Sequence, residues 1–345
     1  MPQVKLRQSI LEFSTYPPVG DDDWRYAFAT ARVRALETQM LPRATFQDMA
    51  NAQSFENALD MLSAGQYAVP KGAAGFADIE EVLLQRRAEV RELFASLMID
   101  ESIVELFKSR DDFANLRLAL RRALTDKPVG ADYSPSGNVA PEVLEQAFAE
   151  ENYAVLPGYV RRAAEAATIN YYQDKDVRRI DYEIDRLQAL HNIDEARRLG
   201  SIFLDGLFRT QVDLTNIRTL LRLKFTESEQ IDVFLDGGFL EPAFYKHGLD
   251  LGYEAIGNLF FATPYQHLVE VGAGYLASNK SFLKTEGQCD RHLIGLLKST
   301  AQITAGPQPI IAYLLMKEHE IRTIRLVLTA KKNSLDTRLI LDRIA

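Results

Sequence analysis

The sequence predicts an all-α protein that consists of three related helical bundles. A nine-residue helical pattern occurs three times, apolar residues recur at helical spacing along most of the chain, and no stretch shows the sustained period-two alternation of a large sheet. Leu, Ala, Arg and Glu are also abundant, and these residues favour helices.

The repeated pattern reads acid, apolar residue, any residue, Asn or Thr, apolar residue, Arg, two further residues and Leu. The spacing of its first two copies continues downstream, because Gly137 matches Gly238 and Pro141 matches Pro242 at the same interval of 101 residues. This agreement indicates a repeated domain. The copies occupy residues 112–120, 213–221 and 320–328, and they begin 101 and 107 residues apart.

On a helix, the apolar positions of each copy fall on one face, with the Arg on one margin and the acid and Asn on the other. Such an Arg can lay its stem across apolar surface and reach a carboxylate on a neighbouring helix. We interpret the recurring polar residues as braces between helices in preference to a partner-binding surface, because charged helix flanks usually serve packing and solvation. The candidate site residues are Arg117, Arg218, Arg325, Asn115 and Asn216.

The pattern divides the chain into a lead-in and three repeats. Residues 1–23 are turn-rich and acidic, so no regular structure is expected there. The three helical repeats are predicted over residues 24–130, 131–236 and 237–345.

In the first repeat, a helix is predicted over residues 24–41, where Pro42 ends it. The capping-box spacing of residues 45–48 predicts a short second helix, and Ser54 is the expected N-cap of a third. Asp78 then opens a long amphipathic helix.

Asp100 and Asp111 are expected to begin the next two helices, and the second of these carries the first copy of the pattern. Residues 128–140 are rich in Pro, Gly, Ser and Asn, which makes them the clearest linker in the chain.

The second repeat begins with a helix at Pro141, since proline is tolerated in the first turn. Residues 156–208 are predicted to be largely helical, and acids and bases interleave at i+3 and i+4 over residues 174–198, as on a solvated helix face or a coiled-coil-like hairpin. After the second copy of the pattern, residues 236–238 (Asp-Gly-Gly) predict a turn and Pro242 begins another helix.

In the third repeat, the helical periodicity weakens over residues 245–285 and glycine becomes frequent, so short or interrupted helices are expected. A strong helical pattern resumes over residues 290–300 and 309–332, and the last stretch carries the third copy.

Composition restricts the classes of function. The formal net charge of −8 argues against non-specific nucleic-acid binding as the main activity. Cys289 is the only cysteine, so no intrachain disulfide can form. The N-terminus lacks the apolar core of a signal peptide, and no run approaches the roughly 20 apolar residues of a membrane span, so we expect a cytoplasmic protein.

No motif indicates catalysis, a cofactor or a metal. The Gly-x-Gly stretch at residues 267–276 lacks the third glycine and the strand–helix alternation of a nucleotide site, so a helix or turn is predicted instead. There is no P-loop, and the five histidines are dispersed. The acidic runs 21–23 and 111–112 are predicted to be helix N-caps in preference to a magnesium–diphosphate site.

The three Arg-bearing helices, together with residues 26–35 and 317–325, resemble the C subunit of the bacterial and archaeal V-type (A/V-type) ATPases, which is equivalent to the d subunit of the eukaryotic V-ATPase. The resemblance runs from about Trp24 to the C-terminus. It implies a pseudo-threefold, funnel-like arrangement of the three repeats. It also implies a non-catalytic central-stalk socket that is peripheral to the membrane through other subunits. This socket joins the central axle subunits of the soluble head to the membrane proteolipid rotor ring, and it transmits torque for ATP-coupled proton or sodium transport.

Two other functions are compatible with these residues. The first is a cytoplasmic α-helical scaffold or adaptor with an unrelated partner, since stiff amphipathic helices suit many scaffolds. The second, less favoured, is a helical magnesium-dependent diphosphate enzyme that uses one of the acidic runs.

Overall fold

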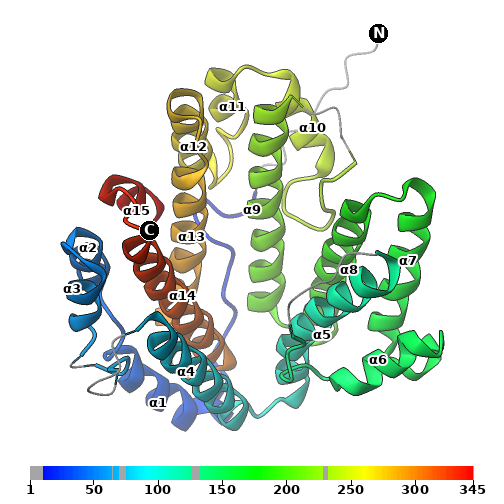
Figure 1. Ribbon diagram of the computed structural model, residues 1–345, viewed down its shortest axis with the longest axis horizontal. Helices are drawn as coiled ribbons and strands as arrows, with labels where there is room; N and C mark the ends of the chain where they lie inside the picture. Colours follow the sequence, from blue (N-terminus) through cyan, green and yellow to red (C-terminus); the bar gives the residue numbers. More distant parts are fainter. Residues whose placement is uncertain (1–10, 64, 70–74, 126–131, 228–231, 345) are drawn as a thin grey trace. The chain divides into compact units, whose positions relative to one another are not determined.

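The computed structural model describes residues 11–63, 65–69, 75–125, 132–227 and 232–344. All regular structure in these ranges is helical, which confirms the predicted all-α class (Figure 1). The chain forms two compact units: Met1–Ile99 together with Gly248–Ala345, and Asp100–His247. Compact units and sequence repeats divide a chain by different criteria, so the repeat boundaries stay a prediction.

The central unit, residues 100–247, has its hydrophobic core between α5, α6, α7 and α8, where Phe113, Leu116 and Ile184 are buried. The charge-laced stretch forms one helix, α8, which packs against α7 on one side and α9 on the other. Its helices are α5 (Glu101–Leu124), α6 (Pro141–Ala149), α7 (Gly158–Asp174), α8 (Val177–Arg198), α9 (Ile202–Thr226) and the start of α10 (Pro242–Asp250).

Helix α5 corrects one prediction from the sequence. The expected break at Asp111 does not occur, because residues 101–124 contain no glycine or proline and their apolar positions stay on one face. Asp111 and Asp112 are therefore not N-caps; they are buried in the middle of one continuous helix.

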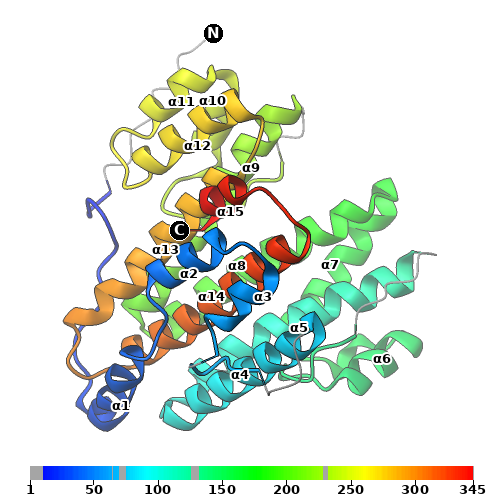
Figure 2. The ribbon, with the colours of Figure 1, turned by 60° about the vertical axis from the view of Figure 1, so that its left-hand side comes forward.

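The terminal unit, residues 1–99 and 248–345, is organised around α14. In both views this helix lies beside α4 and α13 (Figures 1 and 2). Its core joins residues of α2, α3, α4, α14 and α15, among them Met49, Leu83 and Leu328. Its helices are α1 (Ala27–Glu37), α2 (Arg43–Asn51), α3 (Phe55–Asp60), α4 (Phe76–Leu97), α11 (Tyr253–Leu259), α12 (Gln266–Asn279), α13 (Leu283–Ser299), α14 (Pro307–Lys332) and α15 (Thr337–Arg343).

Several predicted helix boundaries are confirmed in detail. The Ser54 hydroxyl oxygen accepts the amide of Asn57 at 3.2 Å and caps α3. Gly237 has φ of 94° in the predicted Asp-Gly-Gly turn, a backbone region in which glycine is favoured. The Gly-x-Gly stretch lies in α12 and is helical, as predicted. Three boundaries differ from the prediction: α1 ends at Glu37, α2 begins at Arg43, and α4 begins at Phe76, so Asp78 lies inside its first turn and does not open it.

The described part of the lead-in, residues 11–23, forms no helix, and it is held by hydrogen bonds to the start of α14. The side-chain amide of Gln308 donates to the carbonyl oxygens of Val19 and Asp21 at 3.1 and 3.0 Å. A carboxylate oxygen of Asp22 accepts the amide of Thr304 at 2.8 Å. Residues 1–10 and 126–131, which include parts of the predicted lead-in and linker, lie outside the described residues.

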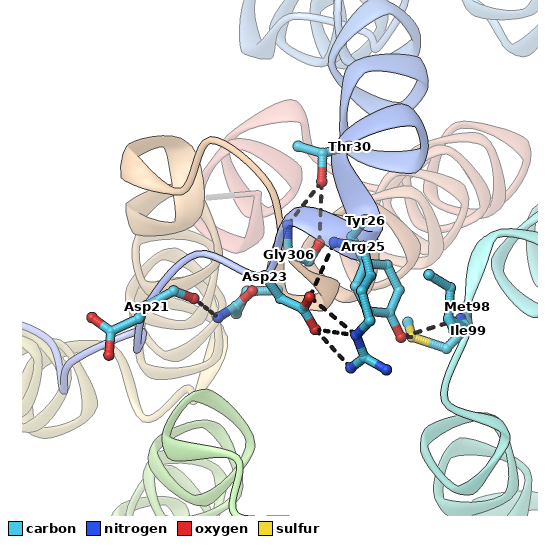
Figure 3. Close-up of polar contacts among 9 residues, drawn as sticks. Asp21, Asp23, Arg25, Tyr26, Thr30, Met98, Ile99 and Gly306 are labelled. Carbon is cyan, nitrogen blue, oxygen red and sulfur yellow. Dashed lines mark hydrogen bonds and ion pairs between the residues drawn. The ribbon is translucent and has the colours of Figure 1, made fainter.

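The same region joins α1 to α14 and to the end of α4. The hydroxyl of Thr30 donates to the carbonyl of Gly306 at 3.2 Å and accepts its amide at 3.1 Å (Figure 3). The buried Tyr26 hydroxyl lies 3.3 Å from the sulfur of Met98 and accepts the amide of Ile99 at 3.1 Å. No helix among the described residues combines the length and apolar character needed to cross a membrane.

Candidate functional site: a carboxylate clamp repeated on three helices

Each copy of the pattern begins with a buried acid whose carboxylate binds a backbone amide of a distant segment; we call this contact a clamp. The first clamp lies on α5, where Asp112 is only 2% exposed. One of its oxygens accepts the amide of Val139 at 2.9 Å, and the other accepts the side-chain amide of Asn138 at 3.0 Å and the hydroxyl of Tyr159. The chain passes this close because residue 137 is glycine: a Cβ atom there would lie 2.2 Å from the carboxylate oxygen.

The second clamp lies on α9, where Asp213 is fully buried. Its carboxylate accepts the amides of Phe239 and Leu240 at 3.0 and 3.1 Å and the hydroxyl of Tyr245 at 2.9 Å. A Cβ atom at Gly238 would again lie 2.2 Å from the carboxylate oxygen.

An asparagine one turn later adds a second tie in both helices. Asn115 donates to the carbonyl of Ser134 at 2.8 Å and accepts its amide at 2.8 Å. Asn216 makes the same pair of bonds with Leu235 at 2.9 and 2.8 Å. The asparagine reaches 19 residues ahead in both cases, and the aspartate reaches 27. The asparagine ties, and the aspartate contacts with Val139 and Leu240, therefore correspond between α5 and α9.

The third clamp lies on α14, where Glu320 is 3% exposed. One carboxylate oxygen accepts the amide of Leu41 at 2.6 Å, and the other accepts the hydroxyl of Tyr67 and a proton of the Lys317 ammonium group. Leu41 precedes Glu320 by 279 residues, whereas the other two clamps hold segments that follow them.

The segment held by each clamp leads into the same kind of element. Val139, Leu240 and Leu41 each stand two residues before a helix, and these helices, α6, α10 and α2, each have nine residues. In α5 and α9 the clamp holds a segment that follows the helix. In α14 it holds Leu41, from the N-terminal part of the chain.

The arginines of the pattern lie on the other margin, and the two whose ion pairs are described, Arg117 and Arg325, reach different helices. Arg117 pairs with Asp181 and Asp185 of α8. Arg325 makes two bonds with Glu80 of α4, at 2.6 and 2.9 Å. Arg218 occupies the equivalent position of α9 and is half-buried. Asn115 and Arg117 hold α5 to its own neighbours, and Arg325 holds α14 to α4.

Comparison with known proteins gives these helices a family. The family model for the ATP synthase (C/AC39) subunit matches residues 29–343, which is most of the chain. The chain belongs to this family. Members of this family are non-catalytic subunits of the rotary ATPase, so the chain is not an enzyme by itself. The match begins in α1 and ends in α15, and it therefore includes all three clamps.

Curated relatives extend over the same length. The C subunit of the A-type ATP synthase of Pyrococcus abyssi is 22% identical and covers 89% of this chain and 88% of the relative. Its counterpart in Methanococcoides burtonii is 22% identical over 99% of both chains. The C subunit of the V-type sodium ATPase of Enterococcus hirae is 25% identical over 87% of this chain and 92% of its own.

In this C/AC39 family member, the clamp on α14 is the most strongly charged of the three. Lys317 is buried with Glu320, and its three ammonium protons go to Glu320, to Gln66 at 3.1 Å and to Tyr67 at 3.0 Å. Burial raises the pKa of the Tyr67 hydroxyl well above its ordinary value, and Glu320 raises it further. Tyr67 therefore stays protonated and remains a donor.

The chemistry of the clamps is structural. Both oxygens of each of the three buried carboxylates, Asp112, Asp213 and Glu320, accept protein donors, as structural carboxylates do. Within the described ranges, no group of three or more His, Cys, Asp or Glu residues is placed to hold a metal ion.

Sequence reasoning missed the partners of Glu320. Only the proline spacing was visible: Pro141 and Pro242 mark helices that begin 29 residues after Asp112 and Asp213, and Pro42 stands beside the start of α2. Nothing in a linear pattern connects Pro42 with Glu320, because they lie at opposite ends of the sequence.

Proposed function

We propose that this chain is the central-stalk socket of a rotary V-type or A-type ATPase. In this role it joins the central axle subunits of the soluble head to the membrane proteolipid rotor ring, and it transmits torque during ATP-coupled proton or sodium transport. It is a cytoplasmic protein that meets the membrane through other subunits. The observation that carries this proposal is the family match over residues 29–343, together with the relatives that are C subunits of such machines.

The clamps suit a part that carries torque. A coupler has to resist deformation, and a buried carboxylate with two to four donors fixes a loop to a helix far more firmly than exposed ion pairs do. The clamps on Asp112, Asp213 and Glu320 each fix the entrance of a short helix in this way.

We also propose the pseudo-threefold, funnel-like arrangement of repeats 24–130, 131–236 and 237–345. The support for it is local: three helices carry the same pattern and hold equivalent segments. Arg117, Arg218, Arg325, Asn115 and Asn216 are proposed as internal braces, since the described contacts of four of them lie within the chain.

Reconstitution tests the function. A rotary ATPase complex that lacks this component is embedded in vesicles, and ATP hydrolysis and ion uptake are measured before and after the purified chain is added. We expect the chain to restore ion uptake driven by ATP. Hydrolysis that stays uncoupled, although the chain co-sediments with the complex, contradicts the torque-transmitting role. Failure to co-sediment contradicts the proposed partners.

A further inference from the structure

A cavity of about 650 Å³ lies in the terminal unit, between α1, the start of α2, α13 and α14. Its volume is within the range of small-molecule sites. Much of its wall is apolar, with Phe46, Leu297 and Met316 among the lining residues. An apolar wall of this size suits the hydrophobic body of a ligand.

The rim of the cavity is cationic although the whole chain carries a net charge of −8. Four cationic side chains line it, against two acids. Both acids are already engaged: Glu37 pairs with Arg34 at 2.9 Å, and Glu320 pairs with Lys317. The four cations are Arg34, Arg43, Arg291 and Lys298.

Three of these cations are available to a ligand. Arg43, Arg291 and Lys298 are exposed, and none of them forms an ion pair with another side chain in the described ranges. Three cations beside one cavity repel one another, and an anion in the cavity removes that repulsion. His319 also lines the cavity, and burial lowers its pKa to about 4, so it is neutral at pH 7 and adds no charge to the rim. Its ring nitrogens already lie 3.2 Å from the Arg322 guanidinium and 3.3 Å from the Thr323 hydroxyl.

The cavity coincides with a departure from the repeated pattern. Where α5 and α9 carry Asn115 and Asn216, each tied to a loop, α14 carries Thr323. The Thr323 hydroxyl turns back to the carbonyl of His319 at 2.9 Å and holds no loop, and it lines the cavity instead. The second tie that α5 and α9 make through asparagine is therefore missing beside this cavity.

The start of α2 also favours an anion. Its N-cap is Pro42, whose side chain cannot accept the first amides, and its first turn carries no acid. Pro42 and Arg43 both line the cavity. The positive end of the helix dipole adds to the field of the three cations.

We propose that this cavity binds an organic anion with a phosphate or carboxylate headgroup and an apolar body. The headgroup lies near Arg43, Arg291 and Lys298, and the body lies against Phe46, Leu297 and Met316. The proposal does not depend on the torque-transmitting role, because it concerns one unit of the isolated chain.

Isothermal titration calorimetry of the full chain with octyl phosphate tests this proposal. Octyl glucoside supplies a similar body without charge, and inorganic phosphate supplies the charge without the body. We expect octyl phosphate to bind at one site, about tenfold or more tighter than either control ligand. Equal binding of octyl phosphate and octyl glucoside, or of octyl phosphate and inorganic phosphate, overturns the proposal.

Two variants locate the site. The triple variant Arg43→Gln, Arg291→Gln, Lys298→Gln changes exposed residues and should weaken octyl phosphate binding about tenfold or more. Its matched control replaces three exposed cations outside the cavity, Arg32, Lys108 and Arg338, with Gln and should bind as the wild type does. Equal weakening in both sets overturns the proposal, because the effect then reflects net charge alone.

A second variant keeps every charge. Ala301 is exposed and lines the cavity, so Ala301→Phe should fill part of it and abolish binding of octyl phosphate without disturbing the core. Wild-type affinity in this variant places the ligand elsewhere and contradicts the proposal.

Vesicle sedimentation distinguishes the source of the anion. Binding to phosphatidylcholine vesicles that contain phosphatidic acid, lost in the triple variant but not in its control, identifies a lipid headgroup. If the chain binds octyl phosphate but does not bind these vesicles, the ligand is a soluble anion. Both results retain the same ligand chemistry.

Discussion

Asp112, Asp213 and Glu320 are buried, and a buried carboxylate is stable only when donors replace the water that it has lost. For each of the three carboxylates, the donors include at least one backbone amide and a tyrosine hydroxyl. The tyrosine comes from a different element in each case, α7, α10 or the segment after α3, although the carboxylate stands at one position of the pattern. The backbone contact is the common feature, and the side-chain contact varies around it.

The first prediction concerns Asp213. Replacement by Ala leaves the amides of Phe239 and Leu240 and the hydroxyl of Tyr245 buried without an acceptor, so we expect a loss of about 3 kcal/mol in the free energy of unfolding. Asp213→Asn keeps one acceptor oxygen and should lose less than half as much. Urea denaturation followed by circular dichroism measures both, and equal losses would contradict the role of the carboxylate.

The second prediction concerns Gly238. Its φ is not in the left-handed region, so the cost of Gly238→Ala comes from the Cβ atom that would lie 2.2 Å from the Asp213 carboxylate. We expect a loss of about 2 kcal/mol. Gly158→Ala is the control, because a Cβ atom there meets nothing within 4 Å and should leave the urea midpoint unchanged or slightly higher. A smaller effect at 238 than at 158 would remove the steric argument.

The third prediction concerns two histidines. Burial lowers the pKa of both His292 and His319 to about 4, whereas the unfolded value is near 6.5. The unfolded chain therefore binds their protons first, so stability is lost as the pH falls from about 6.5 to 4. Replacing both with Gln should flatten the pH dependence of the urea midpoint in that interval. An unchanged slope would show that other groups, such as the carboxylates and His191, whose pKa burial also lowers, set acid stability.

At the scale of elements, the arginines link neighbouring helices and leave the clamps to fix the loops. Arg325 and Glu80 join α14 to α4 with two bonds, a geometry that lysine cannot reproduce. Both side chains are about one-third exposed, so solvent screens the pair.

The fourth prediction is a double-mutant cycle on this pair. Arg325→Ala and Glu80→Ala should each lower the free energy of unfolding, with a coupling energy of about 0.5 kcal/mol. Arg325→Lys should recover less than half of the loss. A coupling energy near zero would mean that Arg325 acts through the packing of its stem.

The helices themselves were largely predictable, because periodicity and capping are local properties of the sequence. Ser54 and Pro141 act at the positions expected of them. Asp111 and Asp112 misled the prediction, because two acids before an apolar run are typical of an N-cap. Their burial could be recognised only together with the loop that follows, and that loop is rich in the residues that sequence patterns assign to solvent.

At the scale of the whole molecule, membership of the C/AC39 family followed from the order of degenerate helix patterns along the chain. The contact of Leu41 with Glu320 did not follow, since 279 residues separate them and no periodic signal connects them. The cationic cavity was also missed, because its rim draws single residues from α2 and α13 that no sequence motif marks.

The equivalence of the three clamps is tested most directly by amide hydrogen exchange, resolved residue by residue by NMR. Val139, Leu240 and Leu41 lie outside helices, yet each donates to a buried carboxylate. We predict slow exchange at all three amides, and a selective loss of protection at Leu41 in Glu320→Ala. Fast exchange of Leu41 in the wild type, alongside slow exchange of Val139 and Leu240, would show that α14 does not share the clamp of the other two helices.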